Sequence, residues 1–180
     1  MDDLISKKVE QAFILDMTCG ARSIWFDKNE PHTVYCDIRK ETFEGDFGKA
    51  LTQDAKKIHR RLNIDPDIVC SFTNLPFESD TFRLVVWDPP HIEKLSKDSW
   101  LRKAYGSLDG DWQPMMRKGF EEAMRVLKPG GVLILKWSDI SISTRDIIKV
   151  IGHTPLFGHR SGKKMNTHWM CYMKFLEEQT

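Results

Sequence analysis

The tetrapeptide Asp88-Pro89-Pro90-His91 has the residue types in this chain that are best suited to chemistry, and it directly follows an apolar run, residues 84–87. A carboxylate followed by two prolines makes a stiff turn that cannot be drawn into a helix. Such a turn can hold a side-chain oxygen and a backbone carbonyl around one planar NH2 group, while His91 offers a flat ring for stacking. For the Asp-Pro-Pro residues alone, an ordinary strand-terminating turn is an equal alternative.

A second polar group follows the apolar residues 13–15. Asp16 ends this run, and Thr18, Cys19 and Gly20 lead into an aromatic pair at positions 25 and 26. The pattern predicts a strand, a tight loop and then a helix whose free N–H groups face a ligand. We expect Asp16 to accept hydrogen bonds from that ligand or to orient the loop. Because the loop lacks the G-x-G-x-x-G spacing, dinucleotide binding is disfavoured.

Two further strand ends supply residues suited to a nucleoside. Asp37 follows the run 32–36 and lies about twenty residues after Asp16, the spacing expected between a nucleotide-loop strand and a ribose-binding carboxylate. We therefore expect Asp37 to bind two vicinal hydroxyls, with a solvated surface aspartate as the alternative. The next run ends at Ser71. Phe72, which follows it, is placed to lie against an adenine ring or to join the core.

The elements that must position these residues alternate along the chain. Strands are predicted near residues 12–16, 32–36, 67–71, 83–88 and 131–137, with helical or irregular stretches between them that include 113–128 and 144–151. This alternation predicts an α/β fold with a single doubly wound, mostly parallel sheet. Two more strands, near 156–159 and 168–175, predict a C-terminal hairpin. Ligands of such sheets bind outside the carboxyl ends of the strands, where Asp16, Asp37, Phe72 and Asp88 converge.

From about Phe13 to Phe175, the order of segments resembles the class I S-adenosylmethionine-dependent methyltransferases. The resemblance is carried by Thr-Asn-Leu-Pro-Phe at 73–77, by the strand into Asp88, and by the helix, Pro-Gly-Gly turn and strand of residues 125–135. The turn is physically sensible, because a helix cannot continue into Pro129 and paired glycines permit a reversal. Within this family, Asp88-Pro89-Pro90-His91 is similar to the D-P-P-aromatic motif of amino-methyltransferases that act on adenine N6 or cytosine N4.

The resemblance implies S-adenosyl-L-methionine as the cofactor and a final strand inserted antiparallel into the sheet. It implies cofactor contacts from Asp16, Thr18, Cys19, Gly20, Asp37, Ser71, Phe72 and Asp88, and catalytic contacts from Asp88, Pro89, Pro90 and His91. Three features depart from the family pattern. The first motif has one glycine, Ser71 stands where an acid commonly contacts the adenine amino group, and His91 replaces the more usual Tyr, Phe or Trp. Phe72 and the nearby backbone are then expected to carry the adenine contact.

The expected reaction is in-line methyl transfer to an exocyclic amine of a base in DNA or RNA, with adenine N6 favoured and the base unpaired or flipped out. Asp88 and the Pro89 carbonyl accept the two amine hydrogens, His91 stacks on the base, and no metal is required. Positioning and electrostatics supply most of the catalysis. Two alternatives stay open: a methyltransferase of a protein glutamine or small amine, and a non-catalytic subunit with a methyltransferase fold. The intact Asp-Pro-Pro turn argues against the second.

Two basic segments are candidates for contact with nucleic acid. One is a predicted basic hairpin loop, residues 158–167, whose expected substrate contacts are Arg160, Lys163, Lys164 and Asn166. It would attract phosphates, with a merely solvated loop as the alternative. The other, residues 92–118, interleaves basic residues with Trp100, Tyr105 and Trp112, which suits unstacked bases and predicts a substrate-recognition insertion. A small satellite core would explain these aromatics equally well. Recognition by a partner subunit or a homo-oligomer also stays open.

The composition agrees with one methyltransferase domain over residues 1–180. Hydrophobic residues make up 41% and charged residues 29%, as in soluble globular proteins, and the net charge is +1. No apolar run approaches the roughly twenty residues that a membrane span needs. The four cysteines are too widely spaced for a zinc site and predict reduced thiols in a cytoplasmic protein. The absence of a Pro-Cys nucleophile argues against methylation at carbon 5 of cytosine.

Overall fold

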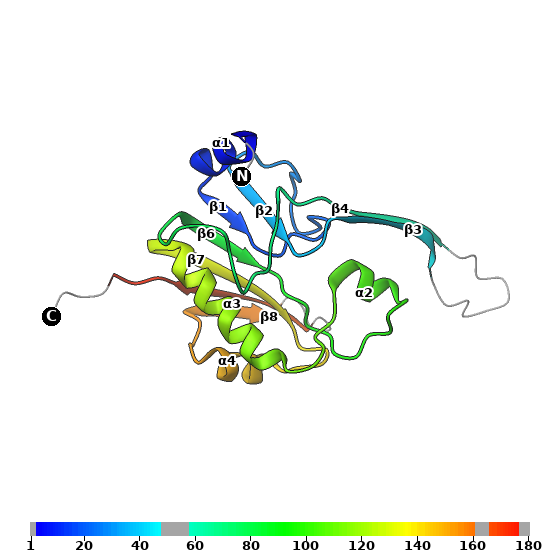
Figure 1. Cartoon of the computed structure of the whole chain (residues 1–180). Helices are drawn as coiled ribbons and strands as arrows, with labels where there is room; N and C mark the ends of the chain where they lie inside the picture. Colours follow the sequence, from blue (N-terminus) through cyan, green and yellow to red (C-terminus); the bar gives the residue numbers. More distant parts are fainter. Residues whose placement is uncertain (1–2, 48–57, 161–165, 177–180) are drawn as a thin grey trace.

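A seven-stranded sheet in the order β5-β2-β1-β6-β7-β9-β8 forms the centre of the protein (Figure 1). The computed structural model describes residues 3–47, 58–160 and 166–176. The strands of this sheet are β1 (Ile14–Asp16), β2 (Thr33–Asp37), β5 (Ile68–Val69), β6 (Phe82–Trp87), β7 (Leu127–Ser138), β8 (Phe157–Arg160) and β9 (Thr167–Met173). The pairs from β5 to β7 are parallel, and β9 runs antiparallel between β7 and β8. The predicted parallel sheet and C-terminal hairpin are confirmed.

The burial of the strands explains their positions. Every residue of β2 is buried, as expected for a parallel strand covered on both faces. Along β7, by contrast, fully buried residues alternate with partly buried ones from Gly131 to Trp137. The alternation sends Leu133, Leu135 and Trp137 into the core, where none of the three is exposed to solvent.

Helices α3 (Trp112–Val126) and α4 (Thr144–Ile151) lie on one face of the sheet (Figure 1). In α3, Met116, Phe120 and Ala123 are buried at the spacing of one helical face. Helix α4 begins at the Ser143 cap, whose hydroxyl accepts a hydrogen bond from the backbone N–H of Asp146, and it ends at Gly152 in the left-handed conformation. Both lie in the stretches that were predicted to be helical or irregular, 113–128 and 144–151.

Two helices and two strands were not predicted. Helix α1 (Asp3–Gln11) precedes the first strand, and helix α2 (Trp100–Tyr105) lies within the predicted insertion. Strands β3 (Glu41–Phe47) and β4 (Ile58–Ile64) pair antiparallel and form a separate ribbon that projects from the body of the protein (Figure 1). The ribbon lies between β2 and β5 in the chain.

The predicted helix after the first loop is wrong. Residues 17–32 form successive turns, and the first of them continue the hydrogen bonding of the sheet: the Met17 amide donates to Val86 and the Cys19 amide to Cys36. Arg22 has a φ of 54°, a left-handed conformation that a right-handed helix cannot contain. The helix N-terminus expected at the ligand is therefore replaced by backbone held between two strands.

Two predicted boundaries also need correction. Helix α3 ends at Val126 rather than at residue 128, because Leu127 already pairs with Phe82 in the sheet. Proline 129 disfavours the helical conformation for the residue before it, and Gly130 takes a φ of 79° where the chain straightens. The third strand was predicted over residues 67–71 and is confined to Ile68–Val69.

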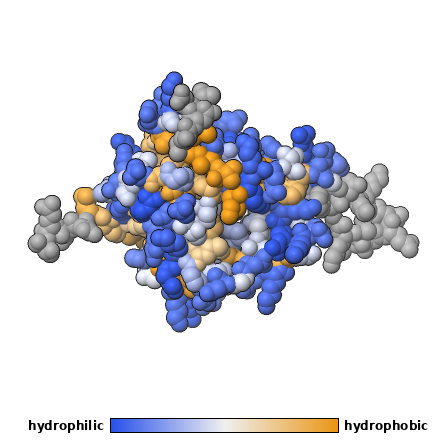
Figure 2. Space-filling view, viewed as in Figure 1, coloured by the Kyte–Doolittle hydropathy of each residue, from blue (hydrophilic) through white to orange (hydrophobic). Residues whose placement is uncertain are grey.

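Hydrophilic side chains cover most of the face shown in Figure 2, and hydrophobic atoms gather beneath the N-terminal helix. Within the described ranges, no helix is long and apolar enough to cross a membrane.

Candidate active site

Three carboxylates meet at the carboxyl ends of neighbouring strands. Asp16 is the last residue of β1, Asp37 is the last of β2, and Asp88 directly follows β6. Because β1 lies between β2 and β6, the chain changes its direction of travel across the sheet here, which is where open α/β sheets bind ligands. A cavity of about 330 Å³ opens at this point. Its lining includes the predicted residues Thr18, Cys19, Gly20, Asp37, Ser71, Phe72, Asp88, Pro89, Pro90 and His91.

The loop after β1 is tied to both neighbouring strands. The hydroxyl of Thr18 accepts a hydrogen bond of 2.8 Å from the backbone N–H of Asp88. On the other side, the Gly20 N–H donates to Asp37 Oδ2 at 2.9 Å, with Gly20 in the left-handed conformation (φ 50°). These bonds fix the backbone of the loop against the walls of the cavity.

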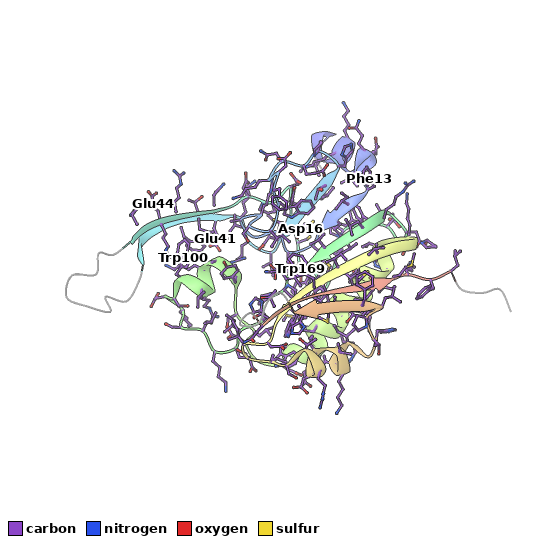
Figure 3. The ribbon with its side chains drawn as sticks, turned by 180° about the vertical axis from the view of Figure 1, so that it is seen from behind. Phe13, Asp16, Glu41, Glu44, Trp100 and Trp169 are labelled. Carbon is purple, nitrogen blue, oxygen red and sulfur yellow. The ribbon has the colours of Figure 1, made fainter. Side chains whose placement is uncertain are left out.

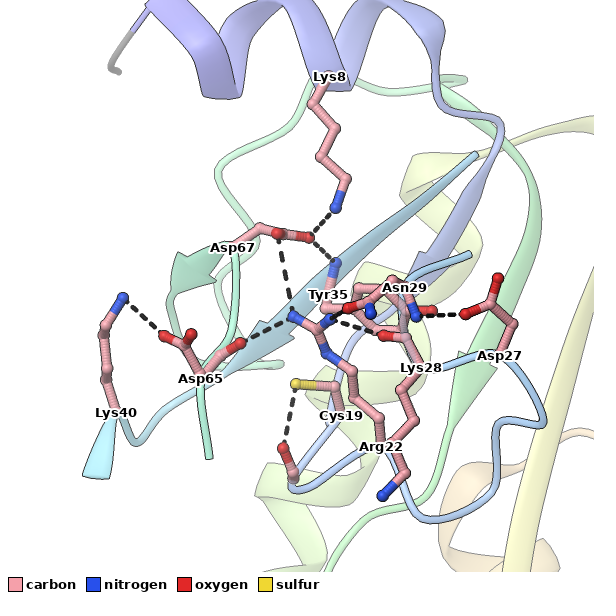
Figure 4. Close-up of polar contacts among 11 residues, drawn as sticks. Lys8, Cys19, Arg22, Asp27, Lys28, Asn29, Tyr35, Lys40, Asp65 and Asp67 are labelled. Atoms are coloured by element: carbon pink, nitrogen blue, oxygen red, sulfur yellow. Dashed lines mark hydrogen bonds and ion pairs between the residues drawn. The ribbon is translucent and has the colours of Figure 1, made fainter. Parts of the chain in front are cut away.

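Arg22 holds the outer part of this loop (Figure 4). Its guanidinium lies 3.9 Å from the centre of the Tyr35 ring and donates to the carbonyls of Lys28 and Asp65 at 2.7 and 2.8 Å. Asp67 stands 4.0 Å away and also forms a 2.6 Å ion pair with Lys8 of α1. The network therefore supports the loop from behind, a role that the sequence did not reveal.

Asp16 does not line the cavity. It is 1% exposed and accepts hydrogen bonds from the indole N–H of Trp25 at 2.7 Å and from the Thr18 amide at 3.1 Å. Burial raises the pKa of Asp16 to about 7, an effect that the two hydrogen bonds only partly oppose. Of the two roles expected for this residue, the structure places it where it orients the loop.

Asp37 connects the cavity to helix α2 through Arg39. The carboxylate accepts bonds from the Arg39 backbone N–H at 2.9 Å and from its Nε at 3.1 Å. Nη1 of Arg39 donates to the carbonyl of Lys103 in α2 at 2.8 Å. Since Asp37 is 5% exposed, its oxygens are held in place at the cavity wall.

The carboxylate of Asp88 forms an ion pair with Lys136 of β7, and Nζ lies 2.6 Å from Oδ2. The two side chains are 13% and 18% exposed, so the pair is largely shielded from water. Lys136 was not singled out from the sequence. Its place follows from the register of the sheet, because Trp87 pairs with Leu135 and the next residue on each strand is Asp88 and Lys136.

His91 stands between two cavities. Its Nδ1 lies 3.3 Å from the Pro89 carbonyl oxygen, which accepts, and its ring meets Trp137 edge-on with 6.2 Å between centroids. Burial lowers the pKa of His91 below its usual value, which outweighs the opposing effect of Asp88. The imidazole is therefore uncharged at neutral pH.

A second cavity, of about 230 Å³, is also lined by His91. Lys136 and Trp137 of β7 line it together with Leu101 and Tyr105 of α2. Gly106 ends α2 and packs against the motif, since a Cβ at this position would come within 2.9 Å of Pro90 Cγ. Helix α2 thus contributes to both cavities, as Trp100, Ala104 and Tyr105 line the first.

The β3–β4 ribbon packs on the other side of α2. The guanidinium of Arg60 lies 5.3 Å from the Trp100 ring centre, and the Lys103 ammonium lies 5.5 Å from that of Phe43. Figure 3 shows Trp100 between α2 and the ribbon, with Glu44 on the ribbon's outer side. Leu62, paired across the ribbon with Phe43, reaches the first cavity. The ribbon and α2 form a wall of this cavity that sequence reasoning missed.

Phe72 lines the first cavity and packs on Trp87, with 5.6 Å between ring centroids. Gly119 of α3 makes room for it, because a Cβ there would come within 2.6 Å of the Phe72 ring. The Ser71 hydroxyl lies 2.8 Å from that of Thr73. Phe72 therefore serves the core and the cavity wall together.

Of the predicted basic loop, the structure describes residues 158–160, 166 and 167, and Thr167 lines the second cavity. Lys163 and Lys164 lie outside these residues, and Arg160 ends β8. Asn166 is exposed, and its carbonyl accepts a bond from the Asp139 amide. The role of this loop stays a prediction. Among the described residues, no cluster of three or more His, Cys, Asp or Glu could hold a metal ion, and the four cysteines are free.

Comparison with models of known families finds no match, and neither does comparison with curated proteins. Solved structures do match. A protein from Pyrococcus horikoshii is 16% identical with a TM-score of 0.54, over 95% of this chain and 85% of its own. A SAM-dependent methyltransferase from Methanosarcina mazei is 13% identical with a TM-score of 0.51, over 98% and 99% of the chains.

A third match is a 16S rRNA (adenine(1408)-N(1))-methyltransferase from Catenulisporales acidiphilia, solved with its cosubstrate SAM. It is 10% identical with a TM-score of 0.53, over 100% of this chain and 94% of its own. At sequence identities this low, the structural similarity shows a shared fold and nothing more. Together with the strand order and the position of the cavity, it shows that the chain has the class I S-adenosylmethionine-dependent methyltransferase fold.

Proposed function

We propose that the protein binds S-adenosyl-L-methionine in the first cavity and methylates an exocyclic amine of a nucleic-acid base, with adenine N6 as the favoured target. S-adenosylmethionine supplies an electrophilic methyl group carried on a sulfonium. The residues that line the cavity fit such a molecule. The Asp37 carboxylate can accept hydrogen bonds from vicinal hydroxyls, Leu62 and Phe72 form apolar walls, and the Thr18–Gly20 backbone borders the cavity. The observation that carries the proposal is that Asp88-Pro89-Pro90-His91 lines this cavity while His91 also faces a second one.

The residues of the motif suit a poor nucleophile. An aromatic amine has its lone pair delocalised into the ring. Asp88 and the Pro89 carbonyl are placed to accept its two N–H hydrogens, which favours a nitrogen whose lone pair points into the first cavity. The nitrogen gives up one proton as it is methylated, and the Asp88 carboxylate is an acceptor for it. His91, uncharged at neutral pH, offers its ring to the base.

The acceptor base is proposed to bind in the second cavity. Its walls are largely apolar and aromatic, with Tyr105, Trp137 and Leu101 beside His91, and they suit a planar ring. The rRNA methyltransferase with the same fold acts on a base, which supports the nucleic-acid class of acceptor. A protein glutamine or a small amine is the alternative, because a planar amide fits the same turn; another structure with this fold is a 1,6-didemethyltoxoflavin-N1-methyltransferase, at 11% identity and a TM-score of 0.51.

Recognition of the wider substrate is assigned to residues 92–118 and to the basic loop 158–167. The first segment leaves β6 and returns through a bridge between Glu93 and Leu108, with α2 in between. Arg102, Lys103 and Tyr105 lie on this helix, and Tyr105 lines the second cavity. The cytoplasmic location, and a partner subunit or homo-oligomer, remain predictions.

Incubation with methyl-labelled S-adenosylmethionine and separate pools of DNA, RNA and protein tests the proposal. We expect label in a nucleic-acid pool, and mass spectrometry of the digested nucleosides should find it in N6-methyladenine. Label confined to the protein pool would favour the glutamine alternative. Binding of the cofactor without transfer to any pool would favour a non-catalytic subunit.

A further inference from the structure

The charges at the two cavities compensate one another. Among the described residues that line either cavity, the acids are Asp37 and Asp88 and the permanent cations are Arg39 and Lys136. Each acid is paired with a cation, Asp37 with Arg39 at 3.1 Å and Asp88 with Lys136 at 2.6 Å. His91 is uncharged at neutral pH because burial lowers its pKa. The walls therefore have no net charge to offer an acceptor.

Two more acids lie behind these walls, and both are hydrogen-bonded to groups other than Asp88. Asp139, which follows β7, is paired with His168 of β9 at 2.9 Å. Asp16 lies behind the first cavity with a pKa raised by burial to about 7, and it is tied to Trp25 and Thr18 rather than facing the acceptor side.

The two oxygens of Asp88 are not equivalent. Lys136 donates to Oδ2, while no group in the described part of the chain donates to Oδ1. The Asp88 backbone is fixed separately, by the bond from its N–H to Thr18. One carboxylate oxygen is thus held by the lysine, and the other is left to accept from a ligand.

We propose that Lys136 is a positioning residue that orients Asp88 and neutralises it, so that the site selects an uncharged planar amine or amide and rejects a cationic amine. This inference rests on the proposed function and narrows it, because it separates base amines and carboxamides from alkylammonium acceptors. The physical reason is that an unpaired carboxylate of low exposure would attract a cation strongly, whereas the Asp88–Lys136 pair has little attraction left for one. A protonated amine also has no lone pair for methyl transfer.

Two pairs of probes, each similar in shape and differing in charge, test the selection. The first is adenosine and 1-methyladenosine, which is cationic at neutral pH. The second is benzamide and benzamidine, a neutral amide and its cationic counterpart. Affinities are measured by NMR titration of protein loaded with S-adenosylhomocysteine, for wild type, Lys136→Met and Lys136→Arg.

We expect wild type to prefer the neutral member of each pair. Lys136→Met should shift the ratio of affinities toward the cation by about tenfold or more, since it uncovers the Asp88 charge. Lys136→Arg keeps the charge and should keep the preference. A merely structural role would weaken both members of a pair equally, and unchanged affinity for S-adenosylhomocysteine serves as the control for folding.

The same ratio in wild type and Lys136→Met would overturn the inference, as would failure of wild type to bind either member of both pairs. The benzamide pair makes this outcome distinguishable from failure of the proposed function. If no nucleic acid is methylated but wild type selects benzamide and Lys136→Met shifts to benzamidine, the charge selection holds and only the assignment to a base is wrong.

Discussion

At the scale of single residues, Asp37 is the clearest test of the cofactor cavity. Its carboxylate ends a fully buried strand and is held by Gly20 and Arg39. Asp37→Ala should weaken the binding of S-adenosylmethionine by about 1–3 kcal/mol, the usual cost of stranding buried hydroxyl partners. Asp37→Asn, which keeps one oxygen, should lose less. Calorimetry that finds unchanged affinity in a folded Asp37→Ala variant would remove this residue from the site.

Substitutions of His91 distinguish a stacking role from a role in proton transfer. If its ring only stacks, His91→Tyr should retain activity and His91→Ala should lose it. The pKa of His91 is lowered by burial, so the ring takes a proton only below its ordinary pKa of about 6.5. Above that pH, the activity of wild type should therefore not change with protonation of the His91 ring. Any loss of activity at lower pH that is due to this protonation should be absent from His91→Tyr. Equal loss of activity in both variants at pH 7.5 would instead indicate imidazole chemistry.

Asp16 should make the protein less stable as the pH rises. Burial raises its folded pKa to about 7, above the unfolded value, so the folded state binds the proton more tightly. Its contribution to the free energy of unfolding is full at acidic pH and is lost as the pH rises through 7. Relative to the non-titrating Asp16→Asn variant, wild type should lose on the order of 2–3 kcal/mol between pH 5 and pH 8. Denaturant unfolding at the two pH values measures this difference, and a constant difference contradicts the assignment.

At the scale of elements, α2 is the part that joins the two cavities. Arg39 bonds the Asp37 carboxylate at one end and the Lys103 carbonyl at the other. Arg39→Ala should therefore weaken S-adenosylmethionine binding and increase the hydrogen exchange of residues 100–105. Arg83→Ala, at an exposed arginine near the opposite end of β6, is the matched control. If Arg39→Ala weakens S-adenosylmethionine binding but leaves the hydrogen exchange of α2 unchanged, the bond from Arg39 to Lys103 does not stabilise the helix.

The sequence allowed some elements to be predicted and not others, for physical reasons. Buried parallel strands such as β2 and β6 contain continuous apolar runs, 34–36 and 84–87, which stand out. The ribbon did not, because β3 has the sequence Glu-Thr-Phe-Glu-Gly-Asp-Phe, in which Thr42 and Glu44 are exposed on one face. Helix α2 has only six residues, too few to show a period. The wrong prediction of a helix after β1 rested on the aromatic pair at positions 25 and 26, and Trp25 of this pair hydrogen-bonds back to Asp16.

At the scale of the whole molecule, the mostly parallel sheet could be predicted but the contacts across it could not. Asp16, Asp37 and Asp88 were placed together because each ends a strand of one parallel sheet. Lys136 meets Asp88 only through the register of β6 on β7, and Arg39 meets Lys103 across 64 positions of sequence. Neither register nor a long-range contact to a loop helix is encoded in local pattern. Lys136 and Arg39, which hold the carboxylates of the site, were therefore identified only from the structure.

The central claim is that Asp88 acts on the acceptor amine at the junction of the two cavities. The most direct measurement compares wild type with Asp88→Ala in two assays, calorimetric titration with S-adenosylmethionine and methyl transfer to nucleic acid followed by nucleoside mass spectrometry. We predict that the variant binds the cofactor as wild type does and loses turnover by about 10²-fold or more. Substantial N6-methyladenine formation by a folded Asp88→Ala variant would contradict the claim.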